Sequence, residues 1–253
     1  MTRKVCRSTA LGLVLLFLIS LLVLSHNDVR KALLFGCTNF WACDNDNLHR
    51  KQDWIQELDK YFGKSRNIDQ TYGSHVIPLF ASVMVTSGSM LEMGCGFFST
   101  PLLDRISKEQ RRFMLTAETD LDWMNKFTHM NSTLHTFVHV PVYEGRINAS
   151  LWNGVGGHQN WGVVFVDHRP GDRRFVDVLR MRHQADILVI HDTETKKYHY
   201  EPVLETFPHK YTCTFWRVHT TVVSDSNPDK INLIKTMTQW SLESIIYSQL
   251  NLY

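Results

Sequence analysis

The sequence predicts an α/β fold, a three-layer sandwich around a mostly parallel, seven-stranded, Rossmann-like sheet. Short apolar runs alternate with helical patterns from about residue 51 onwards, which is typical of parallel sheets covered by helices. One run, WGVVFV at residues 161–166, is almost purely apolar, as a strand buried on both faces should be. The length of 253 residues suits one such domain with a single core.

The elements follow from local patterns along the chain. Apolar residues at helical spacing in 54–62 predict a helix that packs one face on the core. Ser99 or Thr100 is expected to cap the helix after the first strand, with Pro101 near its first position. The expected strands cover residues 89–93, 113–117, 136–140, 161–166, 186–190, 211–218 and 220–223. The expected helices cover residues 54–62, 77–85, a segment after Ser99, 121–127, 173–182 and a closing segment from Asn227.

The N-terminus has the pattern of a targeting segment. Arg3, Lys4 and Arg7 precede an apolar run over residues 10–24. The run lies between the lengths of a spanning helix and of a signal-peptide core, so residues 1–25 form either an uncleaved signal-anchor helix or a cleaved signal peptide. Both alternatives predict entry into the secretory pathway. An uncleaved helix predicts a single-pass type II membrane protein with its body in the Golgi or ER lumen, and cleavage predicts a secreted protein.

Further features bear on this compartment. Residues 26–50 are polar and irregular, which predicts a stem before a domain over 51–253. Cys37 and Cys43 either close a small loop in an oxidising lumen or remain two free thiols. Asn131 and Asn148 begin glycosylation sequons, which predicts a glycoprotein. Cys95 and Cys213 are expected to be buried small hydrophobic residues.

Composition excludes several classes of protein. The 27 basic and 25 acidic residues leave a net charge of +2, which argues against an electrostatic nucleic-acid binder. Hydrophobic residues make up 43% and charged residues 21%, so the chain is not disordered. Five cysteines are too few for a disulfide scaffold. No C-x-x-C or H-E-x-x-H sequence is present, which argues against a structural zinc site and a zincin protease.

Ligands of parallel sheets bind beyond the carboxyl ends of the strands, so the residues that follow each strand are the candidates for function. After the first strand, Gly94 and Gly96 let the backbone turn tightly and approach a ligand, and the helix behind them favours a carboxylate or phosphate. A dinucleotide loop would carry Gly or Ala at position 99, where Ser99 stands, which disfavours an oxidoreductase.

Acidic residues follow three further strands. Glu118 lies where an acid can accept both hydroxyls of a ribose; alternatively it is a solvated acid at a helix start, and Asp120 could cap that helix. Asp167 follows the fourth strand, and His191 with Asp192 follows the fifth. Neighbouring buried acids are costly unless they are paired or bind something, so this edge is the better candidate for function.

The segment Leu91-Glu92-Met93-Gly94-Cys95-Gly96, with Glu118 and Asp167 downstream, resembles the class I S-adenosylmethionine-dependent methyltransferases. The resemblance covers about residues 85–225. It implies a methyltransferase sheet with S-adenosyl-L-methionine as cofactor, cradled at its methionyl part by the glycine loop and held at its ribose by Glu118. The cofactor-binding residues that it implies are Glu92, Gly94, Cys95, Gly96, Ser99, Glu118 and Asp167.

The residues after the fourth and fifth expected strands resemble those of two methyltransferase subfamilies. Asp167 and Asp192 resemble the acids of catechol-type O-methyltransferases, which hold Mg²⁺ with an additional Asn. Thr193 stands in place of that Asn here, and two carboxylates with waters could hold Mg²⁺, so no metal ligands are assigned. The Val-Asp and His-Asp pairs also resemble plant polysaccharide O-methyltransferases, which are short, N-terminally anchored Golgi enzymes. These resemblances imply a hydroxyl-bearing acceptor, either a glycan or a small molecule.

A sugar hydroxyl is a poor nucleophile and needs a general base. The candidate catalytic residues are therefore Asp167, His191 and Asp192, with His191 or Asp192 as the base. Alternatively, His191 is a structural residue that bridges the two acids. A nearby basic cluster either binds an acidic substrate or is a solvated helix start; it consists of Arg169, Arg173 and Arg174. Two nearby aromatic residues, Trp152 and Trp161, either form a platform for a sugar ring or pack in the core.

Other functions remain open. A methyltransferase fold could bind a glycan or protein without catalysis, although the joint presence of Gly94, Glu118 and Asp167 argues against this. A luminal glycosyltransferase would carry an Asp-x-Asp motif, and residues 44–46 match one, but they lie in the expected stem. A catechol-like small-molecule methyltransferase is the alternative within the same chemistry.

Overall fold

The computed structural model describes residues 45–63, 74–143, 146–147, 149–157 and 159–249. The expected N-terminal apolar helix, Cys37, Cys43 and Asn148 lie outside these residues. Within the described part of the chain, no helix is both long and apolar enough to cross a membrane.

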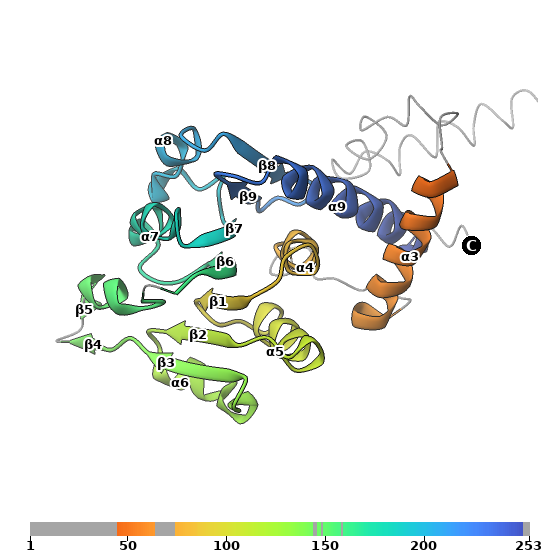
Figure 1. The fold of residues 1–253 in the computed structure, drawn as a ribbon. Coiled ribbons are helices and arrows are strands. Elements are labelled where there is room, and N and C mark those ends of the chain that lie inside the picture. Colours follow the sequence, from red (N-terminus) through yellow and green to blue (C-terminus); the bar gives the residue numbers. More distant parts are fainter. Residues whose placement is uncertain (1–44, 64–73, 144–145, 148, 158, 250–253) are drawn as a thin grey trace, which may run out of the picture. The chain divides into compact units, whose positions relative to one another are not determined.

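A seven-stranded sheet forms the centre of the domain (Figure 1). Its strands are β1 (Ser89–Met93), β2 (Met114–Glu118), β3 (His135–His139), β6 (Trp161–Val166), β7 (Ala185–His191), β8 (His209–Cys213) and β9 (Thr220–Ser224). Their order across the sheet is β3-β2-β1-β6-β7-β9-β8. The first five in this order run parallel, and β9 runs antiparallel to both of its neighbours, β7 and β8. The expected mostly parallel sheet is confirmed.

Helices cover both faces of the sheet, which gives the expected three layers. One apolar cluster joins the sheet to α3 (Asn45–Phe62), α4 (Val76–Met84), α5 (Ser99–Gln110) and α9 (Pro228–Gln249). A second cluster joins the opposite face to α7 (Arg174–Met181) and α8 (Glu201–Leu204). Alternate residues of one strand serve the two clusters: Phe165 faces the first, and Val164 and Val166 face the second.

Short elements complete the connections. The helix expected over 121–127 is divided into α6 (Leu121–Asn125) and the 3₁₀ turn η1 (Thr128–Met130). The two-stranded ribbon of β4 (Val142–Tyr143) and β5 (Arg146–Ile147) precedes η2 (Ala149–Gly154). Two further 3₁₀ turns are η3 (Gly171–Arg173) and η4 (Lys196–Tyr198).

Three sequence-based expectations were wrong in detail. Helix α3 begins at Asn45, so the last part of the expected stem is helical. Strand β8 ends at Cys213, because its pairing with β9 closes at Cys213 and Thr220 and the residues between them make the connection. Neither Ser99 nor Thr100 caps α5, whose N-cap is Phe98 with no side-chain hydrogen bond. The Thr100 hydroxyl instead donates to the buried Glu92 carboxylate at 2.9–3.0 Å.

Candidate functional site

Gly94 brings the loop after β1 against the loop after β6. A Cβ atom at this position would lie 2.6 Å from the carbonyl oxygen of Asp167 and 2.8 Å from the Cα of His168. Its φ of +94° is also one that only glycine adopts without strain. Hydrogen bonds on both sides hold this approach: Gly94 N donates to Ala117 O at 2.8 Å, and Asp167 N donates to Met93 O at 2.8 Å. Gly94 is therefore first a requirement of the fold at this edge.

Glu118 ties the end of β2 to the glycine loop. Its Oε2 accepts a hydrogen bond from the backbone N–H of Cys95 at 3.1 Å, and its Oε1 accepts from Thr119 N at 2.6 Å and Asp120 N at 3.0 Å. Asp120 caps α6 by accepting from Trp123 N at 2.9 Å, as the sequence suggested. The Glu118 carboxylate is thus fixed and buried at the edge of the sheet, and its Oε1 also accepts from the Thr119 hydroxyl at 3.1 Å. Oε2, with one N–H donor and a longer contact to Cys95 Sγ, is the oxygen that keeps acceptor capacity for a ligand hydroxyl.

Glu92 lies behind the glycine loop and is fully buried. Its carboxylate accepts hydrogen bonds from the hydroxyls of Thr100 and Thr116, the latter at 2.9 Å. Burial raises the pKa of Glu92 to about 8, although these hydroxyl groups oppose the shift. Ser99 is also buried beside it. Both residues are placed to support the loop, and their contact with a cofactor stays a prediction.

The buried Glu92 makes the free energy of unfolding depend on pH. The folded state holds this proton up to about pH 8, whereas the unfolded chain releases it near 4.5, so we expect stability to fall as pH rises between these values. The slope approaches about 1.4 kcal/mol per pH unit. Urea unfolding of Glu92→Gln at pH 5, 6.5 and 8 should lack this contribution, whereas Glu205→Gln at an exposed position should keep it. Parallel profiles for wild type and Glu92→Gln would contradict the assignment.

Asp167, His191 and Asp192 meet at the ends of β6 and β7, as predicted. His191 Nδ1 lies 3.3 Å from Asp167 Oδ1 and 3.7 Å from Asp192 Oδ1. Burial opposes ionisation of Asp167, but His191 and Arg174 outweigh it and lower the pKa of Asp167 to about 2. Burial also disfavours the charged form of His191, but Asp167 outweighs it and raises the pKa of His191. The three residues form one electrostatically coupled cluster.

Arg174 joins the two acids of this cluster. It is buried, and its guanidinium contacts Asp167 Oδ1 at 2.9 Å and Asp192 Oδ2 at 3.0 Å. It also donates to the backbone oxygens of His168 at 2.6 Å and Asp167 at 3.0 Å. The alternative of a solvated helix start is therefore wrong for Arg174, which compensates the paired acids from within the site.

The Mg²⁺ ion that the catechol-type resemblance implies does not fit these residues. An ion shared by Asp167 and Asp192 would need the position that the Arg174 guanidinium takes between them. Thr193, which stands in place of the expected Asn, pairs its hydroxyl with that of Thr221 at 2.9 Å. No step of the chemistry is therefore assigned to Mg²⁺ at these acids.

Neighbouring residues from the sequence analysis have structural roles. Trp152 and Trp161 are buried and pack in the core, so their side chains form no exposed sugar platform. His168 lies in the loop after β6 and is buried, with its Nε2 3.1 Å from Asp177 Oδ2. Arg173 also pairs with Asp177, at 3.0 Å.

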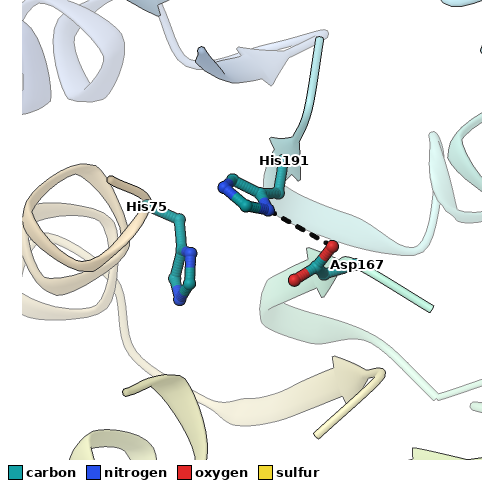
Figure 2. Close-up of side chains that lie close together, drawn as sticks. All are labelled: His75, Asp167 and His191. Atoms are coloured by element: carbon teal, nitrogen blue, oxygen red, sulfur yellow. Dashed lines mark ion pairs between the residues drawn. The ribbon is translucent and has the colours of Figure 1, made fainter. Parts of the chain in front are cut away.

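His75 is a site residue that the sequence analysis missed. It directly precedes α4, and its ring lies 4.6 Å from that of His191 and 4.9 Å from that of Phe165, centroid to centroid. Burial lowers the pKa of His75 to about 3, so the imidazole is neutral. Figure 2 shows it across from Asp167 and His191, which come from neighbouring strand ends. Its only sequence signal is a polar residue ahead of an apolar helix, far from any strand end.

The sheet order, the single antiparallel strand and the glycine loop at the carboxyl edge agree with the Rossmann-like methyltransferase sheet expected from the sequence. No family model matches the chain, and no curated protein matches it.

Several of the solved structures that resemble the chain carry methyltransferase descriptions. A cofactor-bound Rv0187 from MTB has a TM-score of 0.46 at 12% identity, over 79% of this chain and 98% of that one. Human methyltransferase-like protein 13 in complex with SAH has a TM-score of 0.44 at 11% identity, over 68% and 89%. The O-methyltransferase TomG from Streptomyces achromogenes, in complex with SAM, has a TM-score of 0.43 at 13% identity, over 74% and 93%.

Proposed function

We propose that the protein is an S-adenosylmethionine-dependent methyltransferase that methylates a hydroxyl group. One observation carries this proposal: the hydrogen bond between Cys95 N and Glu118 joins the glycine loop to a fixed carboxylate beside the Asp167–His191 cluster. At this edge, the glycine loop lets the backbone approach a ligand closely, and Glu118 can accept hydrogen bonds from ribose hydroxyls. The Asp167–His191 cluster can accept a proton. The residues that would hold the cofactor are Glu92, Gly94, Cys95, Gly96, Ser99, Glu118 and Asp167.

The bound cofactor supplies a methyl group already activated on a sulfonium. The protein therefore needs mainly to align the acceptor oxygen with that carbon and to exclude water. With the cofactor bound, the acceptor oxygen would take the methyl group, the electron pair of the carbon–sulfur bond would stay on sulfur, and the cluster of Asp167, His191 and Asp192 would accept the hydroxyl proton. Arg174 holds the two acids in place during this transfer.

The proposed acceptor is a sugar hydroxyl in the secretory pathway, and the N-terminal helix would attach the protein to the membrane if it is not cleaved. The apolar run at 10–24 supports this compartment. Asn131, the first residue of a sequon, is exposed and open to glycosylation. A catechol-like small molecule is the second candidate acceptor, supported by the acids that follow the fourth and fifth strands in the sequence.

Methyl transfer from labelled S-adenosylmethionine to a panel of glycans and catechols tests this function in the full chain. We expect incorporation into a hydroxyl acceptor, reduced about 10²–10⁴-fold in Asp167→Asn because the proton-accepting cluster is broken. Asp225→Asn, which removes a surface acid paired with Arg182, should leave the rate unchanged. Equal rates for Asp167→Asn and wild type would contradict the proposed role of the cluster. Cofactor binding without transfer to any acceptor would favour a non-catalytic binding protein.

A further inference from the structure

We propose that His75, Asp167 and His191 form a binding site for one divalent transition-metal ion. Ligand atoms from the three side chains all lie within 4.8 Å of one another. His191 Nδ1 and Asp167 Oδ1 are 3.3 Å apart, close to the roughly 3.4 Å between ligand atoms around a tetrahedral ion with bonds of about 2.1 Å. The other pairs lie within 4.8 Å, so the His75 ligand atom would have to move inwards to reach the spacing around an ion.

Orphaned nitrogen atoms point to a missing partner at this place. Both ring nitrogens of His75 are buried and have no hydrogen-bond partner among the described residues, and Nδ1 of His191 is buried with the Asp167 carboxylate as its near neighbour, at 3.3 Å. Leaving a buried polar atom unpaired costs about 1–3 kcal/mol, so the two nitrogens of His75 need an explanation. A metal ion coordinated by His75, Asp167 and His191 would satisfy one nitrogen of each ring at once.

The surroundings of His191 prepare it as a ligand. Its Nε2 lies 3.0 Å from the hydroxyl of Ser74, which can accept the ring N–H. This bond holds the ring with Nδ1 toward Asp167 and leaves the Nδ1 lone pair for an ion (Figure 2). Such an outer hydrogen bond is usual for metal-binding imidazoles.

Charge and donor type indicate the class of ion. Asp167 and Asp192 carry two negative charges against the single positive charge of Arg174, which leaves an excess that attracts a cation. Two imidazoles with one carboxylate suit Zn²⁺, Fe²⁺, Co²⁺ or Ni²⁺, whereas Mg²⁺ and Ca²⁺ prefer oxygen ligands. Arg174 and His191 both face Oδ1 of Asp167, so an ion bound at Oδ1 would share this oxygen with the guanidinium.

The ion would act on the acceptor, a role that rests on the proposed methyltransferase function. The Asp167 and Asp192 side chains are 26% and 25% exposed, so these two acids are accessible to an acceptor. An acceptor oxygen bound at the free coordination position would have a lowered pKa and lose its proton more easily. His191 would then act as a ligand, and a neighbouring acid such as Asp192 would take the proton.

Zinc titration of the full-length protein, stripped of metal by a chelator, tests the site. We expect one Zn²⁺ per chain in wild type and at least about 100-fold weaker binding in His75→Phe and His191→Phe. His183→Phe, which removes an exposed histidine, should bind as wild type does. Phenylalanine at position 75 keeps a ring against Phe165 and removes the orphaned nitrogens, so this variant should fold at least as well as wild type without metal.

Two results would overturn the site: equal zinc affinity in wild type and His75→Phe, or no zinc binding by folded wild type. The visible spectrum of bound Co²⁺ gives a second readout, which should show imidazole coordination and disappear in His75→Phe. Calorimetry with S-adenosylmethionine separates this proposal from the proposed function. Cofactor binding without zinc binding would support the methyltransferase function and contradict the metal site. Zinc binding without cofactor binding would support the metal site and contradict the methyltransferase function.

Discussion

Gly94→Ala is expected to lower the free energy of unfolding by about 3 kcal/mol or more. The new methyl group would lie 2.6 Å from the carbonyl oxygen of Asp167, which is backbone and cannot rotate away. The φ of +94° adds strain for any residue other than glycine. Two loops of the carboxyl edge must therefore separate, which would also displace Asp167 and the proton-accepting cluster. Urea unfolding followed by circular dichroism measures the loss.

Gly96→Ala is the matched control for this prediction. A Cβ atom at Gly96 would meet only the Ser99 hydroxyl oxygen, at 3.4 Å. The φ angle of Gly96 is not positive, so the backbone there accepts other residues. We expect its stability to stay within about 1 kcal/mol of wild type. Similar stabilities for the two variants would show that the close approach at Gly94 does not exist. If the prediction holds, a Gly94 variant that does not bind the cofactor has lost stability as well. A substitution at Gly96 is then the better test of cofactor binding.

Arg174→Met is expected to lower the free energy of unfolding by about 2–4 kcal/mol. The substitution keeps much of the apolar stem but removes the charge that compensates Asp167 and Asp192. Two backbone oxygens that accept from the guanidinium, those of Asp167 and His168, also lose a partner. Thermal and urea unfolding at neutral pH, where both carboxylates are charged, measure the cost.

Arg182→Met makes the same chemical change outside the site. Arg182 pairs with Asp225 at 2.7 Å, but both side chains are partly exposed, so the loss should be about 1 kcal/mol or less. Adding Asp192→Asn to Arg174→Met should restore part of the stability, because it removes one of the two uncompensated charges. An Arg174→Met variant as stable as Arg182→Met would contradict the role given to Arg174.

Strand ends were predictable because apolar runs mark the strands of a sheet covered on both faces. The residue after each run then lies at the carboxyl edge, so Glu118, Asp167 and His191 could be placed near one another without knowledge of the packing. Helix limits were less certain: α3 begins inside the expected stem because polar residues of a helix start resemble an irregular segment. Thr100 looked like a helix cap, but tertiary packing directs its hydroxyl to Glu92.

His75 was missed in the site, and Arg174 was named there without its role as partner of the two acids; both have one cause. His75 and Arg174 reach the cluster from the starts of α4 and α7, and their importance depends on how those helices pack on the sheet. Neither lies in a motif, and periodicity cannot show which end of a helix meets a strand end. The pairing of Arg174 with the two acids could have been inferred from charge alone, since two neighbouring buried acids require a compensating cation.

The edge formed by the glycine loop and Glu118 is proposed to bind S-adenosylmethionine. Calorimetric titration of the full-length protein with S-adenosylmethionine and its demethylated product tests it directly, with Gly96→Val as a folded variant in which the side chain fills the loop. We predict saturable one-to-one binding by wild type and at least tenfold weaker binding by Gly96→Val. Failure of well-folded wild type to bind either compound at millimolar concentration would contradict the claim.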